Sequence, residues 1–161
     1  MTTELRPMPN KSLSEWIEGV GRDYEQSRMK AGDSQEVAAE KARTSTETSF
    51  PDGTPAAGQL VYDVVAVTPG VSNEVIGYLW ITQIEDGGDA WWVSDIKIDE
   101  NRRGQGHGRA AMQLAETAAA EHGAVTLGLN VFGYNTVARG LYESLGYETT
   151  AVQMRKQLSV Q

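Results

Sequence analysis

Three glycines at alternate positions, Gly104, Gly106 and Gly108, are the feature that most constrains the fold of this 161-residue chain. An apolar run that alternates like a strand, residues 91–98, precedes them, and an alanine-rich run typical of a helix, residues 110–121, follows. Arginines flank the glycines on both sides. Glycine lets backbone N–H groups turn toward an anion, and a helix N-terminus adds unpaired donors and the positive end of its dipole. The segment therefore predicts a strand–loop–helix unit that binds a phosphate.

Length and composition predict a single domain with its own hydrophobic core. The sequence has no cysteine and only two histidines, so neither a disulfide nor a metal site is expected. No apolar run approaches the ~20 residues of a membrane span, and the N-terminus lacks the core of a signal peptide, so we expect a cytoplasmic protein without a membrane partner. The net charge of −8 argues against nucleic acid as a partner, because nucleic acid attracts a basic face.

The N-terminal third is predicted to form a short strand followed by two helices. Residues 5–8 form the strand, which prolines close at its end. Ser12 and Glu15 fit a capping box at the start of the first helix, and apolar residues follow at helical spacing. Asp33 and Glu36 indicate the start of the second helix. A turn rich in proline and glycine comes next, without the shift in composition that would mark a second domain.

The remaining residues change from helical to strand-like periodicity. Alternating apolar residues predict strands, and Gly123 and Gly146 each follow a helical run, where glycine commonly ends a helix. This order predicts an α/β protein with a mixed sheet and helices on its faces. The expected strands are residues 59–68, 74–85, 90–99, 125–131 and 147–156, and the expected helices run from the glycine loop to about residue 122 and from about 135 to 145.

Several phosphate-binding loops share such glycines. A Walker-type loop needs a Gly-Lys-Ser/Thr end, and this loop contains no lysine. A dinucleotide fingerprint needs an acidic residue about 20 positions on, but residues 126–130 hold none. A loop whose glycines only pack against a helix remains an alternative.

A second segment, residues 130–147, helps to decide which kind of phosphate-binding loop this is. The pattern Arg103-x-x-Gly106-x-Gly108 resembles the pyrophosphate loop of the GNAT superfamily of N-acetyltransferases, and residues 130–147 resemble its second motif, an asparagine-led helix ending in Leu-Tyr-Glu and Leu-Gly-Tyr. The resemblance implies an α/β fold with a mostly antiparallel mixed sheet of six to seven strands, helices on both faces and a splayed central pair of parallel strands. It also implies one domain over residues 1–161. In that domain residues 1–56 hold the N-terminal strand and the acceptor-side helices, and residues 57–161 form the sheet core with the coenzyme A site.

The same resemblance implies acetyl-CoA as co-substrate and no metal. Backbone groups of the strand before the loop would hold the pantetheine arm, with the N–H group of Ile98 as the donor to the acyl oxygen. The loop would bind the pyrophosphate, and Asn135 would hydrogen-bond the arm. Asn135 is also a natural N-cap, and it lies two helical turns before Tyr142 on the same face. The full set is Ile96, Lys97, Ile98, Arg103, Gly104, Gln105, Gly106, His107, Gly108, Arg109, Asn135 and Tyr142.

Two residues are the candidates for acid–base catalysis. The resemblance places Tyr142 near the sulfur, where it would protonate the departing thiolate; the alternative is a core tyrosine. A lysine-like acceptor amine is neutral about one time in 2,500 at pH 7, a deficit of roughly 4.6 kcal/mol, so a carboxylate base would help. Asp95 is our candidate, because it lies on the strand beside the acyl site; the alternative is a structural carboxylate paired with Lys97. We interpret His107 as a packing or surface residue.

The predicted activity is transfer of an acetyl group from acetyl-CoA to a primary amine by direct attack in a ternary complex. A catalytically idle acyl-CoA sensor on the same fold and a structural domain that binds nothing are the alternatives. The acceptor is left open between a small molecule and a protein N-terminus or lysine. A homodimer is compatible with a sheet that ends in an edge strand and a short tail. The aromatic residues considered for the acceptor side are Trp16, Tyr24, Phe50, Trp91 and Trp92.

Overall fold

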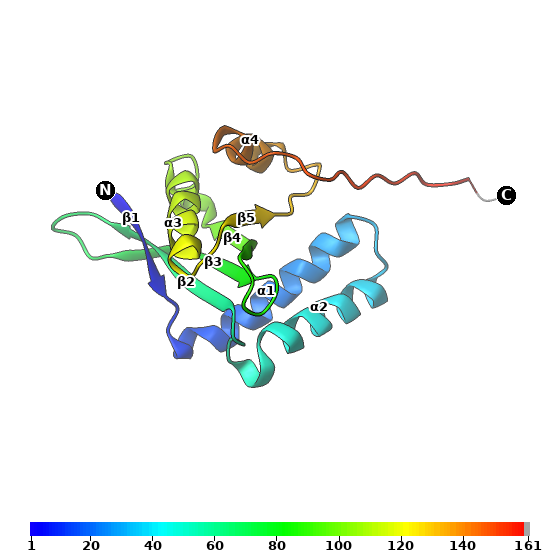
Figure 1. The fold of residues 1–161 in the computed structure, drawn as a ribbon, viewed down its shortest axis with the longest axis horizontal. Coiled ribbons are helices and arrows are strands. Elements are labelled where there is room, and N and C mark those ends of the chain that lie inside the picture. The colour runs from blue at the N-terminus through cyan, green and yellow to red at the C-terminus, as the bar shows by residue number, and fades with distance from the viewer. Residues whose placement is uncertain (160–161) are drawn as a thin grey trace.

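A five-stranded sheet forms the centre of the computed structural model, which describes residues 1–159 (Figure 1). Its spatial order is the chain order, with β1 to β4 antiparallel to their neighbours and β4 parallel to β5. The expectation of a mixed, mostly antiparallel sheet is confirmed, but the expected six to seven strands are reduced to five within the described residues. The parallel pair lies at one edge of the sheet and not at its centre, because no described strand follows β5. The strands are β1 (Thr2–Pro7), β2 (Gln59–Val67), β3 (Glu74–Gln83), β4 (Ala90–Ile98) and β5 (Thr126–Leu129).

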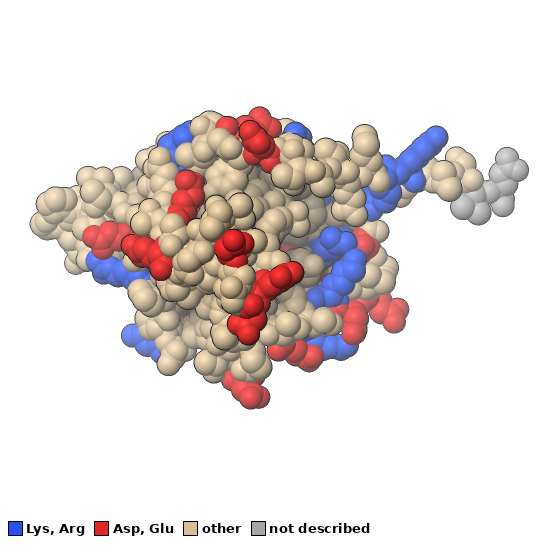
Figure 2. Space-filling model, in the orientation of Figure 1, with Lys and Arg blue, Asp and Glu red and all other residues tan. Residues whose placement is uncertain are grey.

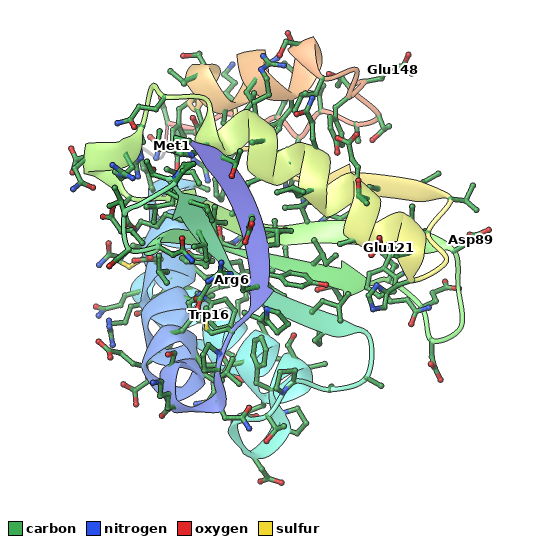
Figure 3. The ribbon with its side chains drawn as sticks, turned by 90° about the vertical axis from the view of Figure 1, so that its left-hand side faces the viewer. Met1, Arg6, Trp16, Asp89, Glu121 and Glu148 are labelled. Carbon is green, nitrogen blue, oxygen red and sulfur yellow. The ribbon has the colours of Figure 1, made fainter. Side chains whose placement is uncertain are left out.

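Helices cover both faces of this sheet, and each face has its own core. Alternation along β3 sends Leu79 and Ile81 to one face, where Met112 of α3 packs against them. Trp80 points to the opposite face and packs with Leu13 and Ile17 of α1. Figure 3 shows α3 running across one side of the sheet and α1, which carries the labelled Trp16, on the other. The helices are α1 (Asn10–Lys30), α2 (Gln35–Ser49), α3 (His107–Glu121) and α4 (Thr136–Ser144), and short 3-10 turns, η1 and η2, lie at Pro51–Gly53 and Glu100–Arg102.

The starts of the first two helices differ from expectation. α1 begins directly after Pro9 without a side-chain cap, so the predicted capping box of Ser12 and Glu15 is wrong. α2 begins after Ser34, whose Oγ accepts a hydrogen bond from the N–H of Val37 at 3.2 Å. Asp33 does not cap the helix because its carboxylate accepts hydrogen bonds from Arg28 at 2.8 Å and Lys41 at 2.9 Å.

The predicted strand at residues 147–156 is wrong. The Tyr147 N–H bonds back to the carbonyl of Tyr142 at 3.0 Å, and the segment that follows has no regular secondary structure through residue 159. Arg155 donates to the carbonyl of Ala31, so the segment crosses toward the α1–α2 connection instead of running along β5. Figure 1 shows it as a projecting arm, and Figure 2 shows basic side chains on it. Val152 and Met154 are among its exposed residues. Within residues 1–159, no helix is both long and apolar enough to cross a membrane.

Candidate active site

β4 loses its parallel partner halfway along its length. Its pairing with β5 covers only Ala90–Val93. The register with β3 shifts at the next residue, Ser94, which has no partner on β3. A bulge bends the strand that carries it and increases its twist, so β4 turns away where β5 stops. Residues 94–98 therefore have a neighbouring strand on one side alone in the described part of the chain.

The backbone of this half-strand presents its polar groups in a defined way. The Asp99 N–H donates to the carbonyl of Ile76 at 2.7 Å, toward β3. Successive residues of a strand point their N–H groups to opposite edges, so the N–H of Ile98 faces the side without a partner. The carbonyl of Lys97 faces β3, where a Cβ on Gly77 would collide with it. Ile96 and Ile98 thus have backbone groups on the open side, whereas Lys97 does not.

The glycine loop follows β4 and leads straight into α3. Gly104 and Gly106 have φ values of 74° and 85°, in the left-handed region that favours glycine. A Cβ at either position would meet nothing within 4 Å, so the space beside the loop is open. α3 begins at His107, and the N–H groups of its first turn have no intrahelical partner. Open space, bare backbone and a helix N-terminus fit the charge and size of a pyrophosphate.

Two arginines of the loop hold its framework. Arg103 Nε donates to the carbonyl of Ile98 at 2.9 Å and so fixes the loop to the end of β4. Arg109 donates to Ser144 Oγ at 2.7 Å and connects α3 with α4. Their charges remain near the loop even though these hydrogen bonds are structural.

His107 has an interior side chain. It is 3% exposed, and its Nδ1 lies 2.9 Å from Oγ1 of Thr3 on β1, while Nε2 is buried without a partner among the described residues. Burial, together with the charge of Arg102, lowers the pKa of His107. The link from β1 to the loop could not be found from the sequence, because Thr3 and His107 are 104 positions apart.

Asp95 is partly buried and is hydrogen-bonded to Tyr78, a residue that the sequence did not indicate. The Tyr78 O–H donates to Asp95 Oδ2 at 2.7 Å. Burial raises the pKa of Asp95, and the hydrogen bonds from Tyr78 and the Ile96 N–H partly oppose this rise. Lys97, considered as the partner of Asp95, instead lies 3.8 Å from Asp23 on α1. Tyr78 could have been suspected from its place opposite Lys97 in an antiparallel register.

Tyr142 on α4 lies within electrostatic reach of Asp95. Burial raises the pKa of Tyr142, and the negative charge of Asp95 raises it further. Asn135 is the N-cap of α4, as expected, and its Oδ1 accepts from the N–H of Ala138 at 3.3 Å. The structure thus brings a carboxylate from β4 and a phenol from α4, 47 positions apart in sequence, to one end of the sheet.

A cavity of about 550 Å³ lies beside Tyr78 and Lys97, along α1. Trp16 lines it, and its ring meets those of Tyr78 at 5.5 Å, Phe50 at 5.4 Å and Trp80 at 5.7 Å, each edge to face. Of the other aromatic residues considered, Phe50 is buried behind Trp16 and Tyr24 is 40% exposed. Trp91 lies in the core of the α3 face, and Trp92 covers Gly128, so neither lines this cavity. Within residues 1–159, no group of three or more Asp, Glu or His side chains could hold a metal ion.

Together these features define an acetyltransferase: a sheet with a diverging parallel pair, followed by a glycine loop at a helix N-terminus. A model of the acetyltransferase (GNAT) family matches residues 34–147, and the chain belongs to this family. It is an N-acetyltransferase, and family membership implies acetyl-CoA as its co-substrate.

Relatives of known sequence and structure agree with this assignment. YycN of Bacillus subtilis, described as an uncharacterized N-acetyltransferase, is 28% identical over 159 residues, 98% of this chain and 100% of its own. YdgE from the same organism is 30% identical over 75% of each chain. The crystal structure of YycN has a TM-score of 0.86 and covers 99% of this chain and all of its own. The fold is also shared with AAC(6')-Iy, solved with a CoA–acetylneamine bisubstrate analogue, at a TM-score of 0.57, 13% identity and coverage of 99% and 100%.

Proposed function

We propose that this N-acetyltransferase transfers the acetyl group of acetyl-CoA directly to a primary amine within a ternary complex. The observation that carries the proposal is the position of Asp95, which reaches Tyr78 on one side and influences the pKa of Tyr142 on the other. Asp95 and Tyr78 lie on the β3–β4 pair beyond the last β4 residue that β5 pairs with, and Tyr142 packs against the core on the α3 face. A base and an acid close to the acyl site are what direct attack requires.

The binding groups follow from the same geometry. N–H groups from Gly104 to Arg109 would hold the pyrophosphate, and the open-side backbone groups of Ile96 and Ile98 would hold the pantetheine arm. Lys97 was included with them from the family resemblance, but because its backbone faces β3 we assign it to the acceptor side. The side-chain nitrogen of Asn135 remains available for the arm, since only its oxygen caps α4. The helices within residues 1–56 would form the acceptor wall, and the sheet core with the coenzyme A site would lie within residues 57–161 of the same domain, of which residues 160 and 161 lie outside the described part.

Each catalytic role matches the environment of its residue. Asp95, directly or through a water, would accept a proton from the attacking amine, and its raised pKa makes it a stronger base than an exposed aspartate. The N–H of Ile98 would stabilise the negative charge that develops on the acyl oxygen. Tyr142 remains protonated at neutral pH because its pKa is raised, so it can donate a proton to the departing thiolate.

An amine panel with detection of free thiol tests this proposal. Acetyl-CoA should raise the melting temperature, whereas adenosine alone should not, and at least one primary amine should release thiol in stoichiometric amounts. Thermal stabilisation without thiol release for any amine would favour the catalytically idle sensor. No stabilisation would favour a structural domain.

We also propose that two copies associate through the C-terminal segment. Residues 148–159 have no strand partner in this copy, and the exposed side chains of Val152, Met154 and Leu158 occur in this short stretch. The outer edge of β5 has no neighbouring strand among the described residues. An unpaired edge and an unpaired extended segment are complementary in hydrogen bonding.

A further inference from the structure

The cavity beside Tyr78 is elongated along α1. Its lining residues on this helix recur at intervals of three and four, so they form one face, which extends from Lys11 to Asp23. These twelve steps correspond to about 18 Å of helix. Gly19, in the middle, contributes no side chain and leaves room. Tyr78 and Lys97 form the opposite wall, so the cavity is an open trough between α1 and the sheet.

Tyr78 connects the trough with the proposed base. Asp95 does not line the trough itself, but Tyr78 does, and its O–H donates to Asp95. Lys97 follows Asp95 by two residues on the same face of β4, which places the two Cα atoms about 6.6 Å apart. The Lys97 side chain would therefore lie close to an amine that is bound next to Asp95.

The charge of the trough is opposite to that of the chain. The whole sequence has 22 acidic and 14 basic residues, whereas basic residues exceed acidic ones along the trough. Lys11 and Arg22 take part in none of the ion pairs found among residues 1–159. The charged lining residues are Lys11, Arg22 and Lys97, with Glu15 and Asp23 as the two carboxylates.

The ion pair of Lys97 can be exchanged for another. Its distance to Asp23 is 3.8 Å, and the side chains are 48% and 56% exposed. An ion pair of this kind contributes little stability, because water solvates both groups. A ligand anion that is covalently linked to the bound amine has a high effective concentration beside Lys97. It would therefore displace Asp23 from Lys97 more readily than a free anion would.

We propose that the acceptor is an amine that also bears an anionic group, a carboxylate or a phosphate, and that Lys97 binds this group. The inference rests on the proposed acetyltransferase reaction at Asp95. A second benefit follows from the same contact, because a neighbouring cation lowers the pKa of the bound amine and raises its neutral fraction. A polycationic acceptor would instead meet three like charges in the trough, with Glu15 and Asp23 as the only carboxylates among the described residues that line it.

Amines of matched length test the proposal through kcat/KM for thiol release. The set contains 4-aminobutyrate, 3-aminopropyl phosphate, 4-aminobutanamide, whose far end is uncharged and which is the neutral amine of the comparison, and the dication 1,4-diaminobutane. The kcat/KM of one or both anionic amines should be about tenfold or more above that of the neutral amine, as expected for one charge-assisted hydrogen bond. It should exceed the kcat/KM of the dication by a larger factor. Comparison of the first two distinguishes carboxylate from phosphate.

Three variants assign the effect to Lys97. The ratio to compare is kcat/KM for the anionic amine divided by kcat/KM for the neutral amine. Lys97→Gln should reduce this ratio about tenfold, mainly through a higher KM for the anionic amine. Asp23→Asn should raise the ratio, because it releases Lys97 from its ion pair. Lys41→Gln removes the same charge from α2, where Lys41 pairs with Asp33 outside the trough, and should leave the ratio as it is. Equal ratios in Lys97→Gln and Lys41→Gln, or a wild-type preference for the neutral amine or the dication, would overturn the inference alone. Absence of thiol release with every amine would overturn the acetyltransferase proposal together with it.

Discussion

The hydrogen bond from Tyr78 to Asp95 sets the protonation of the proposed base. It lowers the pKa of Asp95 against the effect of burial, so Tyr78→Phe should raise that pKa further. Because Asp95 must be deprotonated to accept a proton, the acidic limb of the pH profile of kcat/KM should move to higher pH in this variant. Tyr24→Phe, which removes a hydroxyl from an exposed position on α1, is the matched control. An unmoved limb would exclude Asp95 as the titrating base.

Tyr142 is the proposed proton donor, so loss of its hydroxyl should act on the chemical step. Tyr142→Phe should lower kcat by about 10²-fold or more, with a smaller change in KM for acetyl-CoA. Steady-state thiol release measures both constants, and Tyr134→Phe, at a 49% exposed tyrosine, provides the comparison. If kcat survives in a folded preparation, another group protonates the thiolate.

Buried His107 should make stability depend on pH. Its pKa lies below the ordinary value of 6.5 in the folded protein, whereas the unfolded chain titrates near that value. As the pH falls below about 6.5, the unfolded state takes up a proton that the folded state resists, so the free energy of unfolding decreases. This contribution is complete above the unfolded pKa and is lost toward the folded one.

Urea unfolding at several pH values between 8 and 5 would measure this effect. His107→Gln should show a shallower decline than wild type, because glutamine does not titrate. His122→Gln removes the other histidine, which is exposed, and should retain the wild-type slope. Parallel curves for wild type and His107→Gln would refute the assignment.

At the scale of elements, β3 and β4 approach closely at Gly77. A Cβ there would overlap the backbone carbonyl of Lys97, which cannot rotate away as a side chain could. Gly77→Ala should therefore lower the free energy of unfolding by about 1–3 kcal/mol. In contrast, Gly140→Ala in α4 meets nothing within 4 Å and should stabilise by up to about 1 kcal/mol, since alanine favours a helix. Chemical denaturation of both variants checks these opposite signs.

Most of these elements could be predicted because their signals are local. Residue periodicity located all four helices and the strands up to β5, and the glycine pattern with the Asn135 helix indicated the family. The failures depend on particular side-chain and backbone contacts that periodicity does not reveal. Asp33 is held by two cations instead of capping α2, and Tyr147 closes the end of α4. The Tyr78–Asp95 pair likewise needs the β3–β4 register, which periodicity alone does not give.

The C-terminal segment affects the molecule as a whole. If two copies pair through it, the full chain should have twice the mass of one chain by light scattering, and a chain ending at Tyr147 should be a monomer. Arg155→Ala removes the contact with the Ala31 carbonyl but keeps the exposed apolar residues, so it should remain dimeric. A monomeric full chain at micromolar concentration would refute the proposed association.

The contact of Thr3 with His107 connects the first strand to the first residue of α3, where the glycine loop ends. Because β1 lies at the edge of the sheet, its amides are among those that open most readily and exchange their hydrogens with solvent. A molecule that settles into the loop would hold His107 and, through it, Thr3. Slower deuterium uptake across Thr2–Pro7 would then report that the loop is occupied.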